Sequence, residues 1–437
     1  MTQSLSHRTK VAIVVEWVNV IATMLLLATI VLSFNYQRYC LYLYAASLLV
    51  DLVVNRRFHR PRLSWQNAVF VAMILYYLCI WIWHIFEDST IVTFRREAEN
   101  RIPFIVFGIL GLVANVNPRL TIRHVMYSIM IPSLIIGIVV TIATLQYISA
   151  TDGSLTFSVY QEVFAHIRVY QFASSHMVFN ICLNVSVVLA VYVFCRSNNR
   201  YERIIIAACV AIAYFFLLTS EGRTGFLTSL LLIMYGVGYW MYRNHRRLLI
   251  PTIVAVLLLG GVGLTLHPRI SKAVQLYESG AATQLNPRSG IWKYSISIGK
   301  ERPIWGYGIS DGRKYFTENV ERNEKMSEYV QSYVNDTDFF TSIYAIHPHN
   351  VWLGAWLEFG IIGVILITLI FVLPIIFTTY TKRLYLIPLL GIIAMQSMFE
   401  SLGPTSIPPI LFAWLIYFVL LTPQITDRKE TLSTDTL

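Results

Sequence analysis

Long apolar runs separated by short polar connections restrict what this chain can fold into. They lie near 11–33, 38–54, 65–85, 103–117, 125–147, 176–195, 204–220, 226–242, 248–266, 350–378, 384–400 and 407–422. Most are long enough to cross the hydrocarbon core of a bilayer as helices. Of the 437 residues, 56% are hydrophobic and 13% are charged, which is more apolar surface than a soluble domain could bury. The sequence therefore predicts an all-α polytopic membrane protein with about twelve transmembrane helices.

The distribution of Lys and Arg over the short connections predicts the orientation. If both termini are cytoplasmic, the cytoplasmic segments contain 18 of these residues and the short outer loops contain 6. An excess of Lys and Arg is typical of short loops that stay in the cytoplasm. We therefore expect both termini on the cytoplasmic side and one large extracytoplasmic loop between helices nine and ten.

This topology divides the chain into one membrane domain with one inserted subdomain. The expected parts are 1–266 with helices one to nine, 267–349 as the large loop, and 350–437 with helices ten to twelve and a cytoplasmic tail. Within the loop, Asn286 and Pro287 are typical of a helix start, and Glu301 to Gly308 supplies a break. The loop is therefore expected to contain packed helices, with a second helical stretch within about 312–334.

The segment His347-Pro348-His349-Asn350 ends the large loop and leads into the apolar run 350–378. Its histidines lie where water meets the membrane, so a titratable group there can meet both a lipid-borne and a soluble substrate. His349 is expected at or just before the start of helix ten. The helix dipole disfavours an imidazolium there, so the neutral ring could act as a base near pH 7.

Two arginines are predicted on the same outer face. Arg223 lies in a tight turn between helices seven and eight, where arginine is costly unless it meets an anion. Arg288 lies in the first turn of the loop helix, where free backbone N–H groups already favour an anion and a guanidinium adds a fork suited to phosphate. Together with a neutral histidine, these arginines suit a substrate whose leaving group is a lipid diphosphate, which implies glycosyl transfer.

Each of these residues also has a structural interpretation that the sequence leaves open. A histidine at a membrane interface can be structural, Arg223 can be an interfacial anchor, and helix starts such as that of Arg288 often carry arginine. Trp292 could stack on a sugar, although aromatic residues are common at membrane interfaces anyway.

The remaining glycines and acidic residues of the apolar runs suggest no chemistry. Gly354, Gly360 and Gly363 are expected to allow close helix packing. Glu16, Asp51 and Glu358 have no obvious basic partner in the sequence, which argues against an ion pump.

The motifs at these positions resemble those of the O-antigen ligase and polymerase superfamily of the bacterial inner membrane. His349 is followed by Asn350, nine residues, Gly360, two residues and Gly363, which is similar to the ligase pattern. Arg223 with Leu227, the segment Arg288 to Trp292, and the turn Pro303 to Gly308 also resemble motifs of this group. The resemblance covers about 204–378 by motif and the whole chain by topology.

The resemblance implies a GT-C-like membrane glycosyltransferase whose active site faces the periplasm. In that family the donor is a glycan on undecaprenyl diphosphate, held by arginines that correspond to Arg223 and Arg288. The histidine corresponding to His349 is the general base, and the anomeric centre inverts. His347, Asn350 and Trp292 are further candidates for substrate contact. The resemblance implies no cofactor and no metal, and we expect membrane lipid but no nucleic acid among the partners.

The acceptor separates two activities that share these motifs. A ligase delivers the glycan to a sugar of the lipid A-core, and a polymerase delivers it to the next lipid-linked repeat unit. We favour the ligase because the histidine, asparagine and glycine pattern is the more ligase-like feature. A non-enzymatic transporter or scaffold for lipid-linked glycans is the alternative from a different class, although a transporter would place charge on midplane helices.

Overall fold

The protein is almost entirely helical where its structure is defined. The computed structural model describes residues 2–32, 34–61, 64–86, 91–151, 175–219, 223–244, 251, 254, 258, 292, 295–309, 348–402 and 408–422. Within these residues there is no strand, and one isolated bridge joins Phe58 and Ala114. The expectation of an all-α fold is confirmed for this part of the chain.

The helices coincide with the apolar runs. They are α1 (Thr2–Ile30), α2 (Phe34–Val54), α3 (Ala68–Phe86), α4 (Ile91–Val113), α5 (Ile122–Thr151), α7 (His176–Arg196), α8 (Arg200–Thr219), α9 (Arg223–Asn244), α15 (Val351–Phe377), α16 (Tyr380–Ser397) and α17 (Pro409–Leu421), with a short 3₁₀ helix η1 (Trp65–Asn67) before α3. Of the predicted runs, only 248–266 falls outside the described residues, apart from three isolated positions.

Six of the described helices are long and apolar enough to cross a membrane: α1, α3, α5, α7, α8 and α15. α9 and α17 contain apolar stretches that are shorter, and α2 and α4 carry charged side chains within or beside their apolar runs. The total of twelve membrane helices and the large outer loop therefore remain predictions. The expected second loop helix within 312–334 lies outside the described residues.

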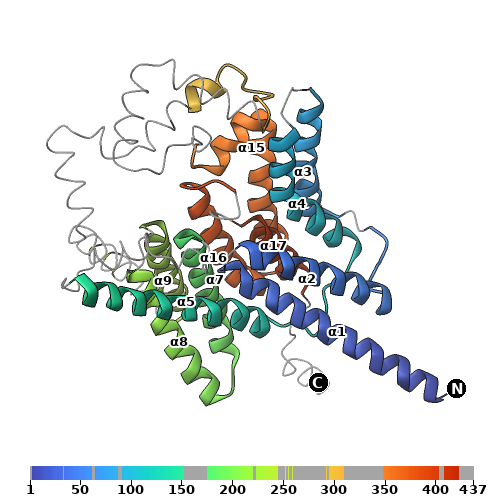
Figure 1. Ribbon diagram of the computed structural model, residues 1–437, viewed down its shortest axis with the longest axis vertical. Coiled ribbons are helices and arrows are strands. Elements are labelled where there is room, and N and C mark those ends of the chain that lie inside the picture. The colour runs from blue at the N-terminus through green and yellow to red at the C-terminus, as the bar shows by residue number, and fades with distance from the viewer. Residues whose placement is uncertain are drawn as a thin grey trace.

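Packing between neighbouring helices gives the molecule its layers. Figure 1 shows α3, α4 and α15 running side by side, and α3 contacts both of the others. α16 packs on α15, on α7 and on α9, so it lies between α15 and the α7–α9 group. The gold segment that contains 292–309 lies beside the upper end of α15 in the same view.

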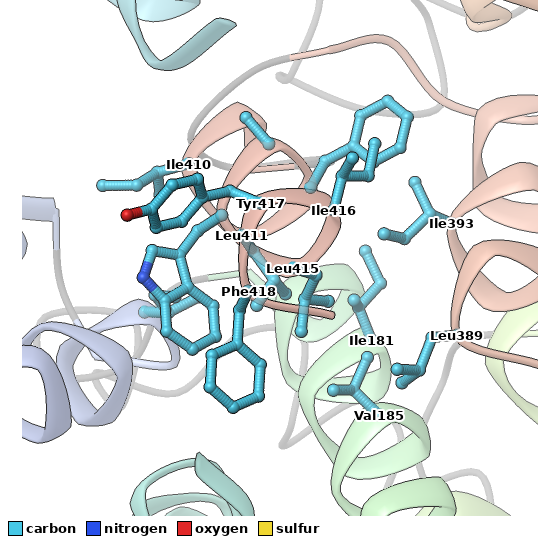
Figure 2. Close-up of a cluster of buried hydrophobic side chains, with 14 of the residues drawn as sticks. Ile181, Val185, Leu389, Ile393, Ile410, Leu411, Leu415, Ile416, Tyr417 and Phe418 are labelled. Atoms are coloured by element: carbon cyan, nitrogen blue, oxygen red, sulfur yellow. The ribbon is translucent and has the colours of Figure 1, made fainter. Parts of the chain in front are cut away.

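The centre of the core is α17. Residues Pro409 to Val419 are all buried, which is expected of a helix that is hydrophobic around its whole circumference. Figure 2 shows its side chains among Ile181 and Val185 of α7 and Leu389 and Ile393 of α16. Because protein encloses α17, this helix of 13 residues does not need the length that would cross a bilayer.

Two acidic residues of the apolar runs do have basic partners, so the expectation that they have none is wrong. Arg57 bonds to Glu16 at 2.7 Å and lies 3.1 Å from Asp51, and Arg119 also bonds to Glu16. These side chains come from α1, from the end of α2 and from the connections before α3 and α5. The fold therefore brings together two connections that were both predicted to be cytoplasmic.

α4 begins at Ile91, twelve residues before the predicted run at 103–117. Five of the added residues are charged, so an apolar pattern alone would begin the helix after them. Glu97 and Arg101 are nevertheless buried, with 2% and 5% of their surface exposed. Tertiary contacts that neutralise these charges therefore extend the helix beyond its apolar part.

Candidate functional site

Asn350 begins α15 and fixes the segment that carries His349. Its side-chain oxygen accepts hydrogen bonds from the backbone N–H groups of Trp352 at 2.9 Å and Leu353 at 3.0 Å, as an N-cap residue does. Its amide nitrogen donates to the carbonyl oxygen of Met398 at 3.1 Å. His349 was expected at or just before the start of this helix, and it lies immediately before the cap.

His349 lies against a buried carboxylate. Its Nδ1 is 3.4 Å from Oε2 of Glu400, which follows the C-terminal end of α16, and 4% of Glu400 is exposed. The His349 imidazole is itself partly exposed, at 23% of its side-chain surface. A carboxylate that faces Nδ1 favours the tautomer in which Nδ1 carries the proton. Nε2 is then the nitrogen that can accept a proton. This arrangement is that of a base whose orientation is set by a third group.

Trp292 joins the large loop to this segment. Its indole N–H donates to the carbonyl oxygen of Pro348 at 2.9 Å, and its ring lies 5.9 Å from the ring of Phe399. Three separate parts of the chain thus meet at one place. We call this group the histidine corner: Trp292, Pro348, His349, Asn350, Met398, Phe399 and Glu400.

Below the histidine corner, α15 is broken at Gly360, which has φ 63° and ψ −154°. The turn Pro303 to Gly308 fills the break. All three hydrogen bonds join backbone N–H groups to backbone carbonyl oxygens. Tyr307 donates to Leu357 at 2.7 Å and Gly308 donates to Glu358 at 2.8 Å, while Ile361 donates to Pro303 at 2.9 Å. The break thus frees backbone groups of α15, and the turn satisfies them.

The contact between this turn and α15 requires glycine on both sides. A Cβ atom on Gly360 would lie 2.0 Å from the carbonyl oxygen of Ile304, and one on Gly306 would lie 2.6 Å from the nitrogen of Gly360. Gly354 behaves differently, because a Cβ atom there would meet nothing within 4 Å. The expectation that these glycines serve close helix packing is therefore wrong for Gly354, and Gly360 instead admits the turn.

Glu358 has a basic partner, so the expectation that it has none is wrong as well. Arg101 of α4 forms two hydrogen bonds with its carboxylate, at 2.6 Å and 2.9 Å. Glu97 lies 3.6 Å from the same guanidinium, which also lies near the rings of Tyr76 and Phe359. This buried ion pair ties α4 to the part of α15 between its start and its break.

The described structure brings together His349, Asn350 and Trp292, three of the residues that the sequence singled out. Arg288 and His347 lie outside the described residues. Arg223 is the first residue of α9, but its side chain is not among those described. The diphosphate-binding arginines and the second histidine therefore remain predictions.

Sequence reasoning missed Glu400 and Arg101. A signal for Glu400 was present, because it is the only acidic residue between Glu358 and Asp427 and it ends the run at 384–400. Arg101 offered no such signal, because it lies among several charged residues in the sequence. Only its position in the fold distinguishes it from them.

The helices and the histidine corner define the class of this molecule: an all-helical, multi-pass membrane protein with a polar corner at the end of a membrane helix. Residues 207–368 match the family model described as O-antigen ligase, so this segment of the chain is similar to the O-antigen ligase family. The matched segment includes Arg223, Arg288, His349 and the break at Gly360, and it ends before Glu400.

A second comparison relates the chain to an uncharacterized protein of Haemophilus influenzae. The two are 26% identical over 182 residues, which is 38% of this chain and 42% of that protein. The chain thus spans about two fifths of the length of the curated relative that it matches. This similarity supports relatedness and carries no statement about activity.

Proposed function

We propose that this protein is an O-antigen ligase, which transfers a glycan from undecaprenyl diphosphate to a sugar hydroxyl of the lipid A-core. The observation that carries the proposal is the His349–Glu400 pair at the start of α15, whose histidine lies within the segment that matches the O-antigen ligase family. A histidine whose Nδ1 faces a buried carboxylate is equipped to accept a proton at Nε2.

In the proposed reaction, Nε2 of His349 takes the proton of the acceptor hydroxyl as its oxygen attacks the anomeric carbon of the glycan. The bond between that carbon and the diphosphate oxygen breaks, and its electron pair leaves with the diphosphate. Attack opposite to the leaving group inverts the anomeric centre. Glu400 stabilises the imidazolium that forms, which lowers the energy of the transition state relative to the ground state.

In this proposal, Arg223 and Arg288 bind the diphosphate, which is the leaving group. Their guanidinium groups would neutralise the negative charge that grows on the diphosphate as the bond breaks. Trp292 and His347 are assigned to sugar contact. Asn350 is assigned a positioning role, because both ends of its amide already bond to the chain around His349. The reaction in this proposal uses no metal and no cofactor.

The proposed setting is the bacterial inner membrane. Both termini lie in the cytoplasm, residues 267–349 form the periplasmic subdomain, and the histidine corner faces the periplasm. Both lipid-linked substrates then reach His349 from the outer leaflet, where the start of α15 meets water.

The test is the glycolipid profile of a strain that lacks the gene, complemented with the wild-type protein or with His349→Ala. A ligase predicts long glycan chains on undecaprenyl and an unsubstituted lipid A-core, restored by the wild type and not by the variant. Lipid A-core carrying a single repeat unit would instead identify a polymerase. Restoration by His349→Ala at equal protein level would contradict catalysis and favour a transporter or scaffold.

A further inference from the structure

A pocket of about 680 Å³ lies between the C-terminal end of α3 and the turn that fills the break in α15. We call it the α3 pocket. It is lined by Ile82 and Trp83 of α3 and by residues 301–306 of the turn, and most of these side chains are apolar. The indole N–H of Trp83 donates to the carbonyl oxygen of Trp305, so the wall formed by the turn is attached to α3. A concave apolar site with few polar groups is typical of a ligand pocket.

An exposed apolar strip leads along α3 into this pocket. Leu75, Leu78, Ile82 and Ile85 follow one another at spacings of three, four and three residues, so they lie on one face of the helix. Between 36% and 76% of the surface of each is exposed. In a membrane helix such a face contacts lipid chains, so a chain that lies along the strip would reach the α3 pocket at Ile82.

The lining of the pocket includes an exposed cation, Arg302. The guanidinium of Arg302 lies over the ring of Tyr307 at 4.9 Å, and no ion pair involves it in the part of the chain that the structure describes. The neighbouring Glu301 accepts a hydrogen bond from the hydroxyl group of Tyr307 at 3.1 Å. An apolar pocket whose lining includes an exposed arginine suits the hydrocarbon chain of a lipid whose head group carries phosphate.

The position of the pocket separates it from the proposed donor site. Arg223, assigned to the donor diphosphate, begins α9, and α16 lies between α9 and α15. α3 contacts α15 directly, and Figure 1 shows α9 and α3 on different sides of α15. Two lipid substrates that react at one histidine need separate paths to it. The α3 pocket lies away from the donor path that begins at Arg223 of α9.

We propose that the α3 pocket binds an acyl chain of the acceptor glycolipid while Arg302 contacts a phosphate of its head group. This inference rests on the proposed function, because that function supplies an acceptor with acyl chains and phosphate. The polyprenyl chain of the donor and the bulk phospholipid of the membrane are the competing occupants.

The direct test is photo-crosslinking of the full-length protein in phosphatidylethanolamine nanodiscs with lipid A-core that carries a diazirine in its acyl chains. We expect adducts at Ile82, Trp83 and residues 302–306. Unlabelled lipid A-core should displace them, and added undecaprenyl diphosphate should not. Displacement by undecaprenyl diphosphate, or labelling that unlabelled lipid A-core does not reduce, would overturn the inference. The labelling does not depend on turnover. Specific labelling of a protein that has no ligase activity would therefore refute the proposed function but still support lipid binding in the α3 pocket.

A pair of variants gives a second measurement. Ile304→Trp narrows the pocket, whereas Ile365→Trp enlarges an exposed side chain of α15 outside it. We expect the first to weaken specific labelling and to raise the KM for lipid A-core about tenfold, the effect of displacing about two buried methylene groups. Its KM for the donor and the behaviour of Ile365→Trp should match the wild type. An unchanged acceptor KM in a correctly folded Ile304→Trp protein would contradict the inference.

Discussion

At the scale of single residues, positive φ angles mark the two positions around which α15 is organised. His349 has φ 47° and Gly360 has φ 63°. A residue with a side chain rarely adopts this conformation, and such strain persists only where the surroundings impose it. At His349 the surroundings are the Asn350 cap and Glu400, whereas Gly360 has no side chain and adopts its positive φ without this strain.

Replacement of Glu400 by glutamine tests the orientation of the proposed base. The variant keeps the shape of the side chain and removes the charge that stabilises the imidazolium. We expect kcat to fall about 10- to 100-fold, the effect of losing one charged hydrogen bond, whereas His349→Ala should cost about 10²- to 10⁴-fold.

A merely structural Glu400 would behave differently in the same assay. Its replacement would then reduce activity in proportion to the loss of folded protein and leave kcat per folded molecule unchanged. Glu400→Asp is the conservative control, because it restores the charge at a greater distance and should recover part of kcat.

Gly360→Ala tests the break in α15. The added Cβ would have to lie 2.0 Å from the carbonyl oxygen of Ile304, at a φ of 63° that alanine resists. We expect a stability loss of about 1–3 kcal/mol or more, measured as a lower midpoint of thermal unfolding in detergent. Gly354→Ala is the matched control on the same helix, and open space around it predicts no loss. Equal effects of the two variants would contradict the contact between the turn and α15.

At the scale of elements, the Arg101–Glu358 pair connects α4 to the upper part of α15. Removing one partner of a buried pair leaves an uncompensated charge and costs about 3–5 kcal/mol. Arg101→Met would leave the carboxylates of Glu97 and Glu358 facing each other, whereas Glu358→Gln would leave Arg101 with Glu97. We therefore expect Arg101→Met to be the more destabilising of the two.

The measurement is again thermal unfolding of the purified protein, now with the double variant Arg101→Met/Glu358→Gln. Loss of the second charge should recover part of the stability that Arg101→Met loses, because the Glu97 carboxylate then no longer faces a second negative charge. Additive losses in the double variant would show that the two side chains do not interact.

At the scale of the whole molecule, the ion pairs of Glu16 with Arg57 and Arg119 place two basic connections at the same end of the fold, as the count of basic residues requires. They join connections at one end of the α3–α4 hairpin, and Arg101 lies toward the other end. If the first end is cytoplasmic, the histidine corner at the start of α15 faces the periplasm. The location of the proposed reaction depends on this single choice.

Single cysteines in a background without the five native cysteines test that choice. Arg60 and Arg95 are both exposed and were predicted on opposite sides of the membrane. A thiol reagent that does not cross membranes should label Arg95→Cys in spheroplasts, and it should label Arg60→Cys only after permeabilisation. The reverse pattern would invert the topology and exclude a periplasmic reaction at His349.

Much of the fold follows from local sequence. Apolar runs predict helices because the pattern and the bilayer thickness act within each run. Boundaries were less predictable: α4 extends twelve residues before its apolar run, because Arg101 meets a carboxylate 257 positions away in the chain.

The sequence by itself determined the helical membrane class, the family motifs and His349 as the candidate base. Only the tertiary structure decided that Glu400 faces this histidine, that Arg101 pairs with Glu358, and that a turn enters the break in α15. The physical reason is the range of the interactions. Apolar character and helix capping act between neighbours in the chain, whereas the partner of a buried charge or of a freed backbone group is selected by packing between distant segments.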